Sequence, residues 1–483
     1  MADSPGAAGP CGTTALGAAR ERAGWTRPGA PPPARSAKRT GDTGDTGDER
    51  AARDTFSLPG EALSEHFALR WGSALSIPDA DADALLQHFE DSWAHQIGSW
   101  AYNEPANLDG TRFNVYLGSS GPGSPDDYNF GGYFSYDGEG YPLIVLNNSS
   151  ADDPASMAMV ISHEFFHAIQ SGTTGYEYAG RAAWYTEATA VWASGEMYPS
   201  DTSHASFIVG YAYLPEQPIY FFDYPDEGTI EEYHQYGAFI FPQYLTEHVA
   251  DPSLVRDSWV LADHSDPLVV LDGLLGERGS GIEESFADFA AHNATWDYER
   301  GAVYAEWEAA YAGIFPGQKA LVNHSRDSGG WQEILGEDAP RRFGSNFVAL
   351  GWPGSEELVV AFEGRDGSGG SAARWWATLV AVFDGEPVYF PLVLEGNAFE
   401  EQVVPGAGGA DAVWLVASVT ADTMSDVETF DWGYTLSSAS ESAPVLTAPA
   451  PKSCGCTTGT TGTTGGAWTL ALVGLLGLAR RRV

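Results

Sequence analysis

Two histidines one helical turn apart, inside an apolar stretch, most constrain how this chain can fold. Residues 157–170 read MAMVISHEFFHAIQ, which places His163 and His167 four positions apart. Side chains with this separation lie on one face of a helix, so both imidazoles can reach the same metal ion. A buried helix flanked by aromatic residues is a poor place for two unpaired histidines. The pattern therefore predicts a helix that carries a metal site.

Glu164 completes an HExxH motif with these histidines. It follows His163 directly, at the edge of the metal-binding face, where its carboxylate can reach a metal-bound water. Zinc lowers the pKa of such a water towards neutrality, and a nearby carboxylate can take its proton as the water attacks a carbonyl carbon. Phe165 and Phe166 point away into the core. We predict a Zn²⁺ site with His163 and His167 as ligands and Glu164 as the general base.

The third protein ligand has to be a histidine or a carboxylate. The three cysteines are Cys11, Cys454 and Cys456, so no thiolate is present between residues 12 and 453. The metzincin pattern requires Gly and a third His just after the motif, but Gln170 and Thr173 stand there. The aspzincin pattern requires an Asp where this chain has Gly175.

A glutamate on the next helix is the remaining arrangement, which is that of the gluzincins. Glu187, within WYTEATAVWAS (184–194), lies twenty positions after His167. That separation lets the chain leave one helix, turn and return beside it. We expect Glu187 to be the third ligand, with Glu177 as the alternative.

Three segments, ISHEFFHAIQ, WYTEATAVWASGEMYP and YHQYGAFIFPQYL, resemble a metalloprotease family found mainly in myxobacterial genomes. The resemblance covers about residues 100–310 and implies a zincin fold and peptidase activity. The motif and its following Glu are also similar to the thermolysin-like group. That group has an Asp four residues after the ligand Glu, where this chain has Val191. Asp152, Asp153 and Thr189 are candidates to orient a ligand histidine in its place.

The same resemblance implies roles for two residues of YHQYG and for one strand. His234 and Tyr236 are expected to stabilise the oxyanion of the transition state, although an aromatic contact at a helix start explains them equally well. YPLIVLNN (141–148) is either an edge strand that binds substrate or an ordinary core strand.

The chain divides into five parts by composition. Residues 1–55 form a disordered leader rich in Gly, Pro and Asp, and residues 56–335 form an α+β zincin-like metallopeptidase domain. Helices are expected at 81–102, 153–172, 181–194, 237–248 and 284–298, with Asp153 as an N-cap, and a further strand at 112–118. Residues 336–440 contain short apolar strands broken by glycines, which predict an all-β sandwich. A linker (441–453) and a tail (454–483) follow.

The tail carries Cys454 and Cys456, a Thr/Gly spacer, an apolar run over residues 467–479, and Arg480–Arg482. The thirteen-residue run is shorter than the roughly 20 residues that span a bilayer. The arrangement resembles a myxosortase-type sorting signal. This resemblance implies export, transient anchoring in the inner membrane through the tail, and cleavage near Cys454 by a sorting protease. The mature protein would lie on the bacterial outer surface or outside the cell.

Charge limits the partners. With 24 Lys and Arg against 66 Asp and Glu, the net charge is −42, which disfavours binding to nucleic acid and to anionic lipid.

Taken together, the motif, the third ligand and the tail predict a surface zinc endopeptidase that acts on protein or peptide substrates. Two alternatives remain: a surface adhesin with an inactive zincin domain, and a zinc amide hydrolase that acts on cell-wall material.

Overall fold

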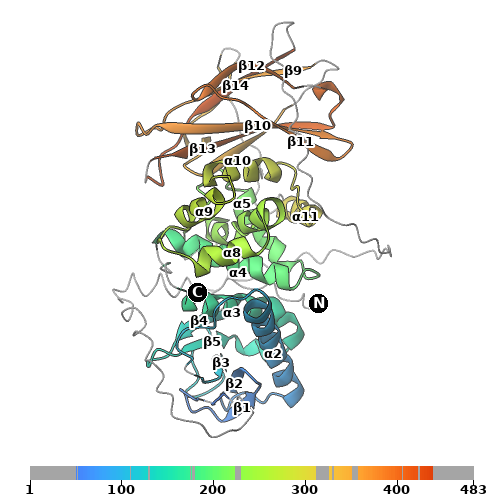
Figure 1. Ribbon diagram of the computed structural model, residues 1–483. Helices are drawn as coiled ribbons and strands as arrows, with labels where there is room; N and C mark the ends of the chain where they lie inside the picture. The colour runs from blue at the N-terminus through green and yellow to red at the C-terminus, as the bar shows by residue number, and fades with distance from the viewer. Residues whose placement is uncertain are drawn as a thin grey trace, which may run out of the picture.

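The computed structural model shows an α+β arrangement of helices and three β-sheets (Figure 1). The structure describes residues 50–438 except for 52, 109, 129–130, 174–175, 177–179, 224–229, 312–325, 329–330, 351–356, 405 and 423–424. A mixed sheet and its helices form the N-terminal part, a group of helices the middle, and strands the C-terminal part.

The N-terminal sheet has the strand order β1-β2-β3-β5-β4. Its strands are β1 (Gly60–Leu63), β2 (Phe67–Trp71), β3 (Phe113–Leu117), β4 (Gly132–Tyr136) and β5 (Pro142–Leu146). Strands β2, β3 and β5 are parallel, whereas β1 and β4 pair antiparallel to their neighbours. The expected strands at 112–118 and 141–148 are thus β3 and β5.

Of the two interpretations of 141–148, the edge strand is wrong and the ordinary core strand is confirmed. Strand β5 lies between β3 and β4, and all five of its residues are buried. A strand covered on both faces is apolar along its whole length, because neither face meets water. The last strand on this side of the sheet is β4.

Helices α2 and α3 pack on this sheet, and α4 packs beside α3. Helix α2 (Asp79–Ser92) continues as a π-helical turn, η1 (Trp93–Ser99), so the helical stretch begins and ends slightly before the expected 81–102. Helix α3 (Ala158–Gly172) follows a 3₁₀ turn, η3 (Pro154–Met157), and α4 spans Ala183–Met197. Asp153 precedes that turn, but its side chain makes no capping hydrogen bond. Nearly every residue of α3 and α4 is buried, because other elements surround both helices.

The expected helix at 237–248 is divided. Helix α6 (His234–Gly237) ends at the first residue of this range. Helix α7 (Ile240–Tyr244) begins three residues later, and a π-helical turn, η7 (Leu245–Val249), follows it. Pro242 has no N–H and is tolerated in the first turn of a helix, which is where the restart at Ile240 places it. The other elements of this region are η2 (Asn148–Ala151), η4 (Gly180–Ala182), η5 (Ser203–Phe207), α5 (Ile208–Ala212), η6 (Ile230–Tyr233), α8 (Ser253–Val260), α9 (Pro267–Gly276), α10 (Ile282–Asn293) and α11 (Gly301–Tyr311).

Two antiparallel sheets form the C-terminal part, with the orders β11-β10-β13-β8 and β12-β9-β14-β7-β6. The strands are β6 (Arg326–Ser328), β7 (Trp331–Ile334), β8 (Gly344–Ala349), β9 (Leu358–Gly364), β10 (Ala373–Phe383), β11 (Glu386–Pro391), β12 (Ala398–Val404), β13 (Ala412–Ala421) and β14 (Trp432–Ser438). Leu379 and Leu415 of one sheet share a core with Phe362 and Trp432 of the other, as in a β-sandwich. Because β6 and β7 precede residue 336, the predicted domain boundary lies too late in the chain.

Part of the hydrophobic core is shared between the C-terminal strands and the helices of the middle part. Phe343, Phe347, Val380 and Val416 belong to the same buried cluster as the helices, and Phe343 contacts Phe286 of α10 with ring centroids 5.3 Å apart. The backbone also joins the two parts next to β8. The amide of residue 345 donates to the carbonyl of residue 215 (2.7 Å), and that of residue 219 donates to the carbonyl of residue 343 (2.8 Å).

The last residues of the predicted leader belong to the folded body. Arg53 pairs with Asp137 at 2.6 Å and with Glu139 at 2.7 Å, and Ala51 forms a β-bridge with Thr111. The rest of the leader, the linker and the tail lie outside the described residues. Within the part of the chain that is described, no helix is long and apolar enough to cross a membrane.

Candidate metal centre

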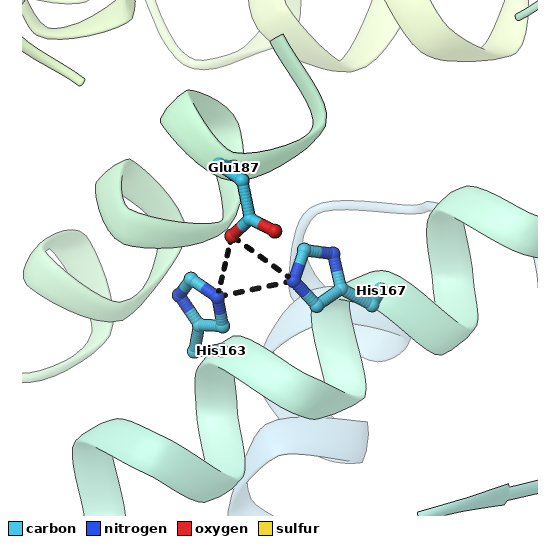
Figure 2. A group of neighbouring side chains, drawn as sticks. All are labelled: His163, His167 and Glu187. Carbon is cyan, nitrogen blue, oxygen red and sulfur yellow. Dashed lines mark hydrogen bonds and ion pairs between the residues drawn. The ribbon is translucent and has the colours of Figure 1, made fainter. Parts of the chain in front are cut away.

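Three side chains from α3 and α4 converge on one point (Figure 2). His163 and His167 come from α3, and Glu187 comes from the second turn of α4. The Nε2 atoms of the two histidines are 3.0 Å apart. Glu187 Oε2 lies 3.2 Å from His163 Nε2 and 3.5 Å from His167 Nε2. The expected ligand set is therefore brought together in the structure.

The Glu187 carboxylate and the His167 imidazole perturb each other's pKa values. Burial alone would raise the pKa of Glu187, but the imidazoles of His167 and His163 lower it to about 2, so the carboxylate is ionised. Burial alone would lower the pKa of His167, but Glu187 and Glu164 raise it, so a positive charge is favoured beside the carboxylate. A buried anion without such a partner would be costly.

A metal ion fits this donor set. The two nitrogens and one carboxylate oxygen lie within 4.8 Å of one another, and all three residues are buried. The second carboxylate oxygen, Glu187 Oε1, is buried and has no hydrogen-bond partner among the described residues. Two histidines and a glutamate are a known ligand set for catalytic zinc, which leaves a further coordination position open. The site can therefore hold a metal ion.

Glu164 lies beside this group and beneath the edge strand. Glu164 is 1% exposed, and the charge of its carboxylate contributes to the raised pKa of His167. A Cβ atom placed on Gly132 of β4 would lie only 3.0 Å from Glu164 Cγ. The edge strand can therefore approach the carboxylate closely because residue 132 has no side chain. This contact places the predicted general base next to β4, the last strand in the order of this sheet.

The structure separates the two residues expected to stabilise an oxyanion. Tyr236 is fully buried, and its ring centroid lies 6.4 Å from that of His163 and 5.0 Å from that of Phe207. The His234 ring instead packs near Phe221, at 5.4 Å. Burial lowers the pKa of His234 to about 4, which favours the neutral imidazole of a core residue. Tyr236 therefore remains a candidate near the ligands, whereas the position of His234 matches the aromatic packing role.

The residue that contacts the second nitrogen of His167 is one that the sequence did not suggest. His167 Nδ1 lies 2.8 Å from Gln170 Oε1, and Gln170 in turn contacts Thr189. Thr189 was one of three candidates for this role and takes part only through Gln170. The other two, Asp152 and Asp153, are exposed. Glu177, the alternative third ligand, lies outside the described residues.

The arrangement can be set beside known proteins. Residues 38–435 match a family described as a family of unknown function, DUF6055. The chain belongs to this family. No curated protein matches the chain. The matched range contains the mixed sheet, the three convergent side chains and every strand of the two C-terminal sheets that the structure describes except the last residues of β14. The family description states no activity.

Proposed function

We propose that this protein is a zinc-dependent endopeptidase with a zincin-like catalytic domain. The observation that carries the proposal is the buried convergence of His163, His167 and Glu187 next to the glutamate of an HExxH motif. A structural zinc site normally has four protein ligands, whereas a catalytic one keeps a position for water. The described residues offer three ligands in one group and a carboxylate beside them, which favours the catalytic type.

The chain's own residues would divide the work as follows. His163, His167 and Glu187 would hold the zinc, which when bound would polarise the peptide carbonyl and activate a water. Glu164 would accept a proton from that water and deliver it to the leaving amine. Burial of the ligands excludes bulk water, which strengthens every electrostatic interaction in the site. Tyr236 would donate a hydrogen bond as negative charge develops on the carbonyl oxygen.

Strand β4 supports an extended peptide as substrate. It is an antiparallel edge strand, and its first residue, Gly132, lies against Glu164. Recognition of an extended peptide beside the outermost strand of a sheet is a recurring mode of peptide binding. A peptide that passes beside Gly132 would carry its backbone past the general base, which suits hydrolysis of a peptide bond within a chain.

We further propose that the protein acts outside the cytoplasm. The support is the tail sequence, with Cys454, a short apolar run and Arg480–Arg482. A sorting protease would cut near Cys454 after transient anchoring in the inner membrane. Mass spectrometry of the mature C-terminus tests this point, because an intact C-terminal Val483 on the surface protein would refute cleavage.

Glu164→Gln tests the catalytic proposal. The amide keeps the size of the side chain but cannot accept the proton, so zinc content and fold should be retained while hydrolysis of casein falls by at least about 10²-fold. Glu65→Gln is the matched control, because the Glu65 side chain is 77% exposed and lies on the connection between β1 and β2.

Each result separates the candidate functions. Full casein hydrolysis by the Glu164→Gln variant would remove the proposed mechanism. A parent protein that binds zinc but cleaves no protein would favour an adhesin with an inactive site. Release of fragments from purified cell wall, with no cleavage of casein, would favour the amide hydrolase.

A further inference from the structure

The side chain of Gln170 lies between the two helices that supply the ligands. It is 3% exposed and comes from α3, three residues after His167. Its amide oxygen is 2.8 Å from His167 Nδ1. Its amide nitrogen is 2.9 Å from the carbonyl oxygen of Thr186 and 2.9 Å from Thr189 Oγ1, both on α4. One neutral side chain therefore connects a ligand histidine with the helix that carries Glu187.

Counting hydrogens fixes the orientation of this amide. The Thr186 carbonyl can only accept, so it takes one hydrogen of the Gln170 amide. The Thr189 hydroxyl already donates to the carbonyl of Tyr185 at 2.6 Å, so its oxygen accepts the second amide hydrogen. Both hydrogens of the Gln170 nitrogen are then used by α4. A reversed amide would place its oxygen against a carbonyl oxygen, which is unfavourable.

The orientation of Gln170 in turn fixes the proton of His167. The amide oxygen faces Nδ1 and can only accept, so Nδ1 must carry a hydrogen. A neutral imidazole with its hydrogen on Nδ1 has its lone pair on Nε2. Nε2 is the atom that faces Glu187 and His163 (Figure 2). The amide thus selects the tautomer that can bind a metal and holds the ring at the angle that aims it.

We propose that Gln170 is the positioning residue of the metal centre, in which a neutral amide held by α4 sets the tautomer and direction of the ligand His167. This inference rests on the proposed zinc site but not on peptidase activity. The neutrality has a physical consequence. Glu187 and Glu164 already balance the two charges of a zinc ion, so a third carboxylate would make the buried group negative. An amide orients the ring without adding that charge.

Two substitutions at residue 170 separate positioning from packing. Gln170→Leu has no acceptor for Nδ1–H and should weaken zinc binding by about 10–100-fold, the usual effect of losing such a partner. Gln170→Glu keeps an acceptor towards Nδ1 but places an oxygen against the Thr186 carbonyl. It should therefore lower thermal stability while keeping zinc affinity within about tenfold of the parent. The measurement is competition for zinc against a fluorescent chelator, with the full chain and circular dichroism to confirm folding.

Gln243→Leu is the matched control. Gln243 is 2% exposed, and its amide nitrogen donates to Glu196 at 3.1 Å and Glu247 at 2.7 Å, away from the ligands. Loss of this amide should reduce stability and leave zinc affinity unchanged. If Gln170→Leu does not fold, Thr189→Val removes the acceptor that holds the amide and should weaken zinc binding by a smaller factor.

The outcomes distinguish this inference from the proposed function. Zinc affinity in folded Gln170→Leu within about twofold of the parent would overturn the positioning role while leaving the peptidase proposal intact. Equal losses of affinity in the Leu and Glu variants would also overturn it, because packing alone would then explain both. A parent protein that binds zinc without cleaving proteins would refute the proposed function and leave the role of Gln170 standing. A parent that binds no zinc would refute both.

Discussion

The close approach of the edge strand to the general base can be tested by a single methyl group. In Gly132→Ala the added Cβ would lie 3.0 Å from Glu164 Cγ, 3.3 Å from Leu146 Cδ2 and 3.3 Å from Val160 Cγ1. Ordinary contacts of this kind begin at 3.4 Å, so Glu164 has to move by about 0.4 Å. The leucine and valine contacts close the other directions, which leaves the carboxylate side chain as the group that must give way.

The expected effect is on turnover. Displacing a catalytic group by 1 Å can cost about 10²-fold, so a shift of a few tenths of an ångström should lower kcat by roughly tenfold. Overpacking should also cost about 1–3 kcal/mol of stability. Zinc content should not change, because the three atoms nearest to the added Cβ do not belong to His163, His167 or Glu187. Steady-state hydrolysis of a fluorogenic peptide and elemental analysis measure the two quantities separately.

Gly138→Ala in the turn between β4 and β5 is the control. A Cβ atom at Gly138 meets no atom within 4 Å, and its backbone does not need a positive φ. This variant should match the parent in kcat and in zinc content. The reasoning fails if Gly132→Ala keeps the parental kcat, or if its loss of activity follows a proportional loss of zinc.

Three further predictions concern single side chains. Glu187→Gln should weaken zinc binding by more than about 10²-fold, since it removes the only ionised ligand, and chelator competition with an unchanged affinity would move the third ligand elsewhere. Tyr236→Phe should lower kcat by about 10²-fold with little change in KM if the hydroxyl stabilises the oxyanion; reduced thermal stability with an unchanged kcat would support packing instead. Burial raises the pKa of Glu216 from 4.5 to about 7, so its stability contribution is complete below pH 4.5 and is lost as the pH rises through 7. This pKa shift corresponds to ~3 kcal/mol, which the partial exposure of Glu216 reduces. The free energy of unfolding of Glu216→Gln, measured with urea, should exceed that of the parent by about 1–2 kcal/mol at pH 8 and equal it near pH 4.

The ligands were accessible from sequence because helical spacing is local. The four-residue step from His163 to His167 and the length of the connection to Glu187 place all three without any knowledge of the sheet. Gln170 could have been found by the same logic, since it lies on α3 within a turn of His167. In the sequence pattern, Gln170 stands out only because the metzincin motif has Gly at this position. Its partners on α4 depend on helix packing that spacing does not specify.

Strand order was beyond the reach of the sequence pattern. Residues 142–146 are apolar throughout, and this indicates burial on both faces and hence an interior strand, as β5 is. Which strand then forms the edge depends on pairing between distant segments, because β4 comes earlier in the chain but lies outside β5. His234 and Tyr236 differ for a related reason. Two residues on one short helix point in different directions, and only the packed structure shows which direction leads to His163.

The shared core between the helices and the sandwich has a consequence for how this protein can be divided. A truncation before β6 would remove Phe343 and Phe347 from the helical core and leave Phe286 of α10 facing water. The isolated sandwich would in turn expose Val380 and Val416. Neither fragment should persist as a soluble folded piece, because each would expose part of the shared core. The family match covers both parts without a break, over residues 38–435.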